Sequence, residues 1–456
     1  MKEVYPTKHR VCRRGNNSSS SRNSVSKLPP AVGSGHCVQR KVGFEFEAPR
    51  LYAFRNYKQF EESNDGDFWF PEKFTEPAFR AGDVLLKANG YELQVDRMED
   101  IRLPYLEVVT EPFEESRAGF ERMCTTLKDM EYLLAHLTGG RYVDDIVSIH
   151  SIAHHGTLTD IGKETIFQAR VNQPYCNMQA SIGIDADKLW KFFDLMAVAH
   201  PDEDELLRNK RSGARKALFG IEEGNVYQEE SESNSARLRY ALLLADRAQK
   251  EFQFSGQAKG LISLMYFYIL VTKREAYASP KSVLSILMRN DFASVFKLLP
   301  DKERLEKEDL WLSIFQFEDF LSSGELSEPL YSHGIFHLRD DPDMESMSHL
   351  TRHDWIVNIA RGKDLLTREH FPEPKSGGMV GSVGALGDKF DAEDGKKKVI
   401  LELRQAEHPL TMPNWRRTAL KVFRFVYAFN HGMPHEYGEH FDLLGRLEYL
   451  EKPLKW

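Results

Sequence analysis

Apolar and polar residues alternate along several short stretches of the chain, and this alternation predicts β-strands. In VGFEFEAPR, residues 42–50, Glu45 and Glu47 are separated by apolar residues. Successive side chains of a strand point to opposite faces, so the two glutamates are expected side by side on one face. Similar patterns predict further strands at 91–95, 105–109, 165–171, 178–184 and 398–405.

A second pattern, with apolar residues three or four positions apart, predicts helices. The clearest case follows Ser116, a good helix-capping residue, and ends at Gly139-Gly140. The apolar run at 261–271 is about half the roughly 20 residues needed to span a bilayer, so we expect a buried helix there. Other helices are expected at about 186–197, 280–299 and 414–429.

Together these elements predict an α+β fold, with a curved, largely antiparallel sheet covered by helices and a helical insertion at about 200–300. With 456 residues and 41% hydrophobic content, the chain can form a large core. Four scattered cysteines contain no CxxC pair, which predicts a reducing compartment, the cytoplasm.

Charge divides the chain into a basic leader and an acidic body. Residues 1–41 carry a net +8, and because the whole chain carries −8, the rest carries −16. An acidic body argues against nucleic acid as the main partner. Residues 1–40 are Ser-rich and poor in apolar residues, which predicts a disordered leader before a catalytic domain at 41–456. The alternative is an address for export by a non-Sec route, since transit-type leaders share this composition.

The predicted strands carry polar groups that would lie on one face if the strands paired. Glu107 lies in YLEVVTEP, and the other pairs are two residues apart: Gln179 with Ser181, and Glu402 with Arg404. Any one strand with this pattern is typical of a half-exposed sheet. Three of the four strands supply Glu, however, which is a ligand that hard divalent cations prefer. The sequence leaves open a solvated face or a metal site.

These motifs, in this order, resemble the glutamate-cysteine ligase and amidoligase group of carboxylate-amine ligases, relatives of glutamine synthetase. The similar motifs are GFEFE, an Asp before YLEVVTEP, MQASIGI and VILELR, which cover about 42–405. The resemblance implies the catalytic fold of that superfamily. It also implies activity that depends on ATP and Mg²⁺ and forms an amide or isopeptide bond through an acyl phosphate.

The resemblance assigns roles to individual residues. Four glutamates match the family's magnesium ligands: Glu45, Glu47, Glu107 and Glu402. Arg404 matches the arginine that meets phosphate, and Gln179 and Ser181 fall on the third strand of the nucleotide site. Gln179 replaces the family's usual His, so a proton-accepting role is lost at this position. Asp96 is further from Glu107 than the family's Asp would be, which leaves its role open.

The expected substrates are a small molecule, peptide or protein with a carboxylate and an amine co-substrate, without nucleic acid or membrane. The basic leader also fits a delivered effector that modifies a target protein. Two alternatives remain: a catalytically inactive relative that acts as a binding module, because of Gln179, and a metal-dependent hydrolase or phosphotransferase that uses the same carboxylates. A structural ion pair between Arg404 and Glu402 is an equal alternative to the phosphate-binding role of Arg404.

Two further motifs have weaker implications. GGMVGSVGALGD at 377–388 matches no Walker or dinucleotide pattern, and it is expected to be a flexible loop, or a lid over phosphates. In SIHSIAHHGT, His150, His154 and His155 have no acidic or cysteine partner at helical spacing. The sequence therefore favours ordinary surface or core histidines over a metal site.

Overall fold

The computed structural model describes the following parts of the chain: residues 41–54, 79, 82–96, 105–138, 146–169, 175–197, 202, 204, 208, 211, 228–274, 286–304, 308–330, 351–363, 391–393, 396–404 and 410–432. The leader at 1–40 and the glycine-rich stretch at 377–388 lie outside them. Val38–Trp456 groups as one unit by its internal contacts.

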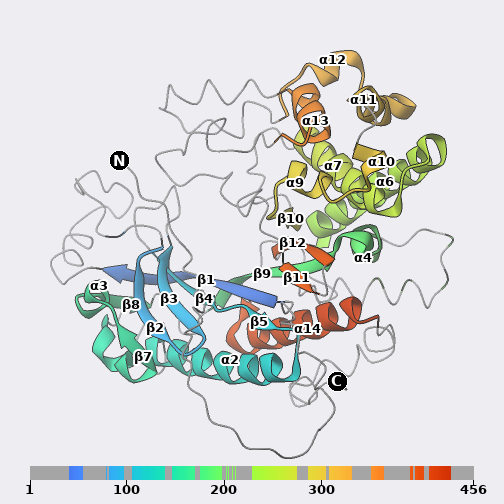
Figure 1. Cartoon of the computed structure of the whole chain (residues 1–456). Coiled ribbons are helices and arrows are strands. Elements are labelled where there is room, and N and C mark those ends of the chain that lie inside the picture. Colours follow the sequence, from blue (N-terminus) through green and yellow to red (C-terminus); the bar gives the residue numbers. More distant parts are fainter. Residues whose placement is uncertain are drawn as a thin grey trace, which may run out of the picture. The chain divides into compact units, whose positions relative to one another are not determined.

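The main feature of the described residues is a large sheet (Figure 1). Its principal order is β10-β12-β9-β1-β4-β3-β2-β7, and all strand pairs among the described residues are antiparallel. The strands are β1 (Lys41–Phe54), β2 (Val84–Ala88), β3 (Tyr91–Asp96), β4 (Tyr105–Thr110), β5 (Phe113–Glu114), β6 (Ile146–Ser148), β7 (Gly156–Leu158), β8 (Ile166–Ala169), β9 (Tyr175–Asp185), β10 (Ile286–Met288), β11 (Asp391–Glu393), β12 (Lys396–Arg404) and β13 (Leu410–Thr411).

Strand β1 is central to the sheet and is longer than its sequence pattern suggested. Its first half pairs with β4 on one side and β9 on the other. The register shifts between Ala48 and Tyr52, and the second half continues beside β8. This irregularity lets one strand join two parts of the sheet, because a bulge bends a strand and increases its twist.

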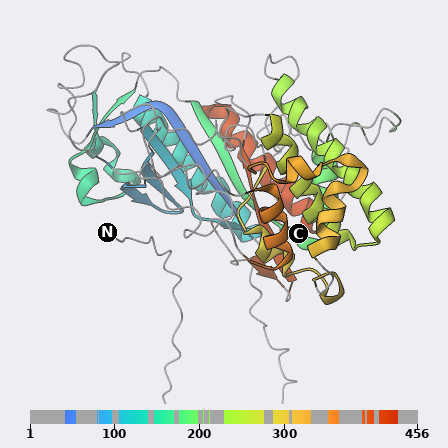
Figure 2. The same cartoon turned by 90° about the horizontal axis from the view of Figure 1, so that it is seen from above.

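Two long helices, α2 (Arg117–Thr138) and α14 (Met412–Asn430), pack on the apolar face of the sheet (Figures 1 and 2). The side chain of Ser116 caps α2, accepting a hydrogen bond from Gly119 N at 3.1 Å. Phe46 of β1 meets Trp415 of α14 edge to face, with ring centroids 4.7 Å apart, and both are fully buried. The predicted helices at these positions are confirmed.

A second group of helices packs around α7 (Gly256–Arg274), which contacts α4 (Leu189–Met196), α6 (Gln228–Phe252) and α9 (Phe292–Phe296). The apolar run at 261–271 forms the buried middle of α7, as expected. Among the described residues, no helix is long and apolar enough to cross a membrane. The shorter helices are α3 (Asp160–Lys163), α10 (Asp301–Arg304), α11 (Glu308–Gln316), α12 (Ser323–Leu326), α13 (Arg352–Ala360), η1 (Ile149–His155), η2 (Ala186–Lys188) and η3 (Phe317–Asp319).

The helix expected through 280–299 is wrong in its described part. Residues 286–288 form β10, which pairs with β12, and only the short α9 follows. Ile286, Leu287 and Met288 are all buried. A short apolar run fits a buried strand as well as a helix, and here pairing with β12 decides. The described part of the segment at 200–300 is thus largely helical but also contributes a strand to the sheet.

The fold is α+β, with a large antiparallel sheet and helices, as the sequence predicted at this level.

Candidate functional site

The sheet has one apolar face and one polar face where β1 passes through its centre. Val42, Phe44 and Phe46 are buried, whereas Glu45 and Glu47 are partly buried. The glutamates therefore lie on the face opposite α14, since alternate residues of a strand point to opposite sides. Residues directly opposite each other in an antiparallel pair share a face, so the registers identify the other members of the polar face.

The registers bring all the predicted strand residues onto this face. Glu47 lies opposite Glu107 of β4, and Glu45 lies opposite Gln179 of β9. On the next strand, Glu402 lies opposite Ser181 and Arg404 lies opposite Gln179. Four segments far apart in the sequence thus contribute side chains to one side of the sheet.

Three carboxylates on this face converge closely, and we call them the acidic triad: Glu47, Asp96 and Glu107. One oxygen from each lies within 4.8 Å of the others. Asp96 joins the group because β3 and β4 pair, which places it opposite Tyr105. The distance between Asp96 and Glu107 in the sequence left the role of Asp96 open. Strand pairing brings the two side chains together. Three negative charges at this spacing repel unless a cation or donor compensates them.

Gln179 connects β9 to the acidic triad. Its side chain is buried, and Nε2 donates a hydrogen bond to Glu47 Oε1. Its other polar atom, Oε1, is buried without a hydrogen-bond partner. A buried acceptor without a partner is costly, so this atom requires an explanation. Ser181, two residues along β9, is partly buried on the same face.

Glu402 of β12 holds two guanidinium groups, which we call the guanidinium pair: Arg289 and Arg404. Arg404 Nε donates to Glu402 Oε1 at 2.5 Å, and Arg289 Nη1 donates to Glu402 Oε2. The Glu402 side chain is 1% exposed, against 18% for Arg404 and 20% for Arg289. Glu402 therefore shares the polar face with the acidic triad but is engaged by arginines, and the ion pair left open by the sequence is present.

The charge of Glu402 is strongly favoured in this setting. Burial raises the pKa of Glu402, but the positive charges of the guanidinium pair and their hydrogen bonds outweigh burial and lower it below the ordinary value. The carboxylate thus stays ionised at neutral pH. It fixes the guanidinium pair in place.

Two residues of this face were not predicted from the sequence. Arg289 follows β10 directly, and its backbone N donates to Ile400 O at 2.9 Å, which anchors it beside β12. Its Nε is buried without a hydrogen-bond partner. Arg289 comes to this face only because the three-residue strand β10 pairs with β12. The residues around Arg289 in the sequence give no sign of this role.

Tyr105 of β4 is the second missed residue, and it is buried beside the acidic triad. Burial, followed by the negative charges of the triad, raises the pKa of the Tyr105 phenol above its usual range. The phenol is therefore neutral at physiological pH and keeps a proton to donate. An alternating YLEVV pattern predicts this tyrosine on the Glu107 face, which was the available signal.

The chemistry of the donor set fits a hard divalent cation with phosphate beside it. Carboxylate oxygens are the ligands that Mg²⁺ prefers, and Mg²⁺ usually takes one or two of them together with substrate phosphates. The acidic triad supplies carboxylates, and Glu45 adds another on the same strand face. The guanidinium pair supplies planar N–H donors of the kind that recognise phosphate.

Comparisons with known proteins give little further information. No protein-family model matches the sequence, and no curated protein matches it. A solved structure of a Vibrio cholerae toxin from the MARTX/VgrG family is similar at a TM-score of 0.36 and 10% identity, covering 81% of this chain and 94% of the toxin chain. A likeness this low supports no conclusion about fold or activity.

Proposed function

We propose that the protein is an ATP- and Mg²⁺-dependent carboxylate-amine ligase of the glutamate-cysteine ligase and glutamine synthetase type. The observation that carries the proposal is the acidic triad, built from three strands, on the same sheet face as the guanidinium pair. Like charges directly opposite each other in a sheet are destabilising. A sheet that keeps Glu47 opposite Glu107 is well explained by a cation.

In this proposal the acidic triad, with Glu45 beside it, holds magnesium. Bound Mg²⁺ and ATP would supply phosphoryl transfer to a substrate carboxylate, giving ADP and an acyl phosphate whose phosphate an amine then displaces to form the amide. The residues of the protein position these groups and neutralise their charge. Phosphoryl transfer requires little covalent chemistry from the protein, so the residue types present are sufficient.

The guanidinium pair is assigned to phosphate. Arg404 and Arg289 carry fixed positive charge at neutral pH, and the buried Nε of Arg289 is available for an acceptor. Glu402 positions both arginines, since its two oxygens accept one hydrogen bond from each. The resemblance assigns Glu402 to magnesium, whereas we assign it to this positioning role because both oxygens are already engaged.

Gln179 is assigned to orientation rather than proton transfer. Its Nε2 holds Glu47 in place, and its unpartnered Oε1 can accept an N–H from the substrate amine. An amide takes up no proton at pH 7, so Gln179 does not act as a base. The neutral phenol of Tyr105 supplies a second hydrogen-bond donor beside the acidic triad.

An ATP-consumption assay with Mg²⁺ over a library of amino acids and peptides tests the proposal. We expect ADP formation that requires both a carboxylate and an amine substrate, with one amide detected by mass spectrometry for each ADP. Glu47→Gln keeps an oxygen for Gln179 but removes the charge, so we expect turnover about 100-fold lower, a loss of about 2.7 kcal/mol in transition-state stabilisation.

Three outcomes contradict the proposal. ATP consumption without any amine would indicate a hydrolase or phosphotransferase that uses the same carboxylates. Binding of Mg·ATP without turnover on any substrate pair would indicate a binding module. Turnover unchanged in Glu47→Gln would show that the acidic triad is not the metal site.

A further inference from the structure

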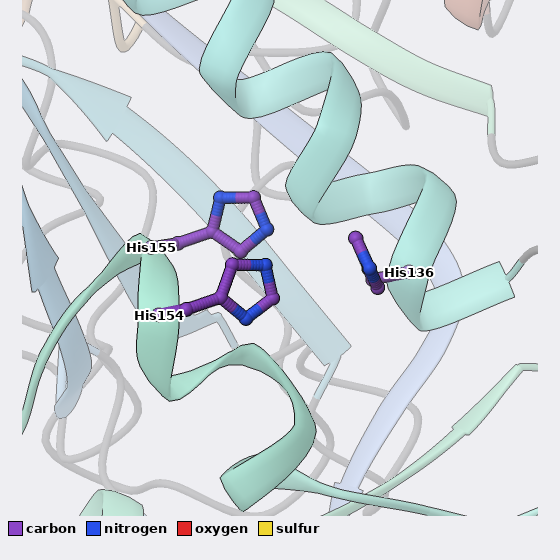
Figure 3. Close-up of side chains that lie close together, drawn as sticks. All are labelled: His136, His154 and His155. Atoms are coloured by element: carbon purple, nitrogen blue, oxygen red, sulfur yellow. The ribbon is translucent and has the colours of Figure 1, made fainter.

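Three histidines form a second cluster, at the end of α2 (Figure 3). It consists of His136 in the last turn of α2 and His154 and His155 at the end of η1. One ring nitrogen from each lies within 4.8 Å of the others. The ring centroids are 4.1 Å apart for His154 and His155, 4.9 Å for His136 and His154, and 5.4 Å for His136 and His155.

His155 is held in the orientation that a metal-binding histidine needs. Its side chain is 4% exposed, and Nδ1 lies 3.0 Å from Asp129 Oδ1. An ionised carboxylate only accepts hydrogen bonds, so Nδ1 is the donor, and in the neutral imidazole Nε2 then keeps its lone pair. Asp129 is itself fixed, because Oδ2 accepts a hydrogen bond from Tyr91 OH at 2.7 Å.

The other ring nitrogen of His155, Nε2, is a candidate ligand for a metal ion. His155 Nε2 is buried and has no hydrogen-bond partner. A buried polar atom without a partner requires an explanation, and a bound ion is one of the standard ones. A carboxylate that holds Nδ1 while Nε2 binds a metal is the recurring outer-shell arrangement of histidine metal sites.

His136 shows the same arrangement with a backbone partner. Its Nδ1 lies 3.0 Å from the carbonyl oxygen of Tyr132, one turn earlier in α2. A carbonyl only accepts, so Nδ1 is the donor, and in the neutral imidazole Nε2 is the nitrogen left to bind a metal. His136 and His154 are both exposed, which leaves the cluster accessible from solvent.

We propose that His136, His154 and His155 bind a divalent transition-metal ion of the zinc class, with water in the fourth position. Imidazole nitrogens suit Zn²⁺, whereas Mg²⁺ prefers oxygen ligands, so this site and the acidic triad select different ions. A tetrahedral ion with bonds of about 2.0–2.1 Å needs nitrogens roughly 3.3 Å apart. Closing the cluster to that spacing requires the rings of His136 and His154 to move, and both are exposed, whereas Asp129 holds His155.

The bound ion would fasten the last turn of α2 to η1. The two elements come from different parts of the sequence, and both pack beside the sheet. Sequence spacing gave no sign of this cluster, because the partners of His154 and His155 are supplied by α2. The sequence favoured ordinary surface or core histidines because His136 and Asp129, which lie on α2, are outside the motif that contains His154 and His155.

Calorimetric titration of Zn²⁺ into the full chain, with excess Mg²⁺ present, tests the proposal. We expect one Zn²⁺ per chain in the wild type and at least 10-fold weaker binding in His136→Gln and in His154→Gln. Both residues are exposed, so neither substitution is expected to disturb folding. His353→Gln is the matched control, since His353 is an exposed helical histidine with an acidic neighbour. The control and Glu107→Gln are expected to bind Zn²⁺ like the wild type.

Asp129→Asn provides an independent test of the outer-shell contact. Loss of the carboxylate is expected to weaken Zn²⁺ binding 10- to 100-fold. Tyr91→Phe removes only the other hydrogen bond to Asp129 and is expected to keep affinity within a few-fold of wild type. Absence of Zn²⁺ binding in the wild type, or unchanged affinity in both His136→Gln and His154→Gln, would overturn the proposal.

Discussion

Glu47 of β1 and Glu107 of β4 lie directly opposite each other in the sheet, and Asp96 places a third carboxylate beside them. Because like charges opposite each other are destabilising, this part of the sheet is expected to be less stable without a cation than with one. The free energy of unfolding should therefore depend on whether a cation occupies the site, and this can be measured without knowing the substrate.

Replacing Glu107 with Gln should stabilise the metal-free protein. The substitution removes one of the three like charges, and we expect a gain of about 0.2–1 kcal/mol in the free energy of unfolding in EDTA. The same variant should lose the stabilisation that Mg²⁺ gives the wild type. Denaturant unfolding with and without Mg²⁺ measures both effects.

Glu92→Gln is the matched control for this experiment. Glu92 lies on the same sheet face but is paired with Lys87 at 3.1 Å and with Gln94 at 3.1 Å. Neutralising it is expected to give no gain in EDTA and to leave the Mg²⁺ effect intact. A Mg²⁺ effect that survives in Glu107→Gln would argue against the triad as the cation site.

Replacing Glu402 with Gln should destabilise the protein strongly at neutral pH. Removing one partner of a buried ion pair typically costs 3–5 kcal/mol, and we expect about that loss here because the guanidinium pair is left uncompensated. Glu308→Gln, which breaks the exposed pair with Arg361, should change stability little by comparison. Wild-type stability in Glu402→Gln would contradict this account.

The Glu402 contribution should also depend on pH in a defined direction. Its pKa is lowered in the folded protein, so the stabilisation is present above the unfolded-state value of about 4.3 and is lost as pH falls through the folded value. The stability difference between wild type and Glu402→Gln should therefore shrink below about pH 4. Unfolding curves from pH 7 to pH 3 measure it, and a difference that grows on acidification would show the opposite sign.

Replacing Gln179 with Glu should make the protein more dependent on Mg²⁺. The new carboxylate would face Glu47, where Nε2 now donates a hydrogen bond. We expect a lower melting temperature in EDTA and a larger Mg²⁺-dependent rise than in the wild type. Gln179→Leu also loses the hydrogen bond but adds no charge, so it should show no enlarged rise. Equal Mg²⁺ responses in the two variants would exclude the electrostatic explanation.

Replacing Phe423 with Ala should destabilise the core without touching the polar face. Phe423 of α14 is fully buried and packs against Phe120 of α2, with ring centroids 5.6 Å apart. We expect a loss of about 3–5 kcal/mol in the free energy of unfolding. Tyr132→Ala, at a side chain that is 65% exposed, should stay within about 0.5 kcal/mol. Equal effects of the two would mean that α14 is not packed as described.

Local periodicity predicted the strands that carry the polar face, which are β1, β3, β4, β9 and β12, but it predicted a helix where β10 lies. The period of two placed Glu45 and Glu47 on one face, and the same rule placed Glu107 correctly. The same rule could not predict that Asp96 joins these glutamates, because the position of Asp96 beside Glu107 depends on the pairing of β3 with β4. Strand pairing is a tertiary choice that no single segment encodes.

Arg289 and His136 were missed for the same physical reason. Arg289 reaches Glu402 only because the three-residue β10 pairs with β12. His136 meets His154 only because α2 and η1 pack together. In each case one partner follows a clear local pattern, whereas the contact is set by packing between elements far apart in the sequence.

Calorimetry of Mg·ATP binding to the wild type, Glu107→Gln and Glu92→Gln tests the central claim most directly. We expect one Mg·ATP per wild-type chain, at least 10-fold weaker binding in Glu107→Gln, and wild-type affinity in Glu92→Gln. The reason is that only Glu107 belongs to the acidic triad, although both glutamates lie on the same face of the sheet. Absence of Mg·ATP binding in the wild type, or equal affinity in the wild type and Glu107→Gln, would contradict the assignment of this face to magnesium and nucleotide.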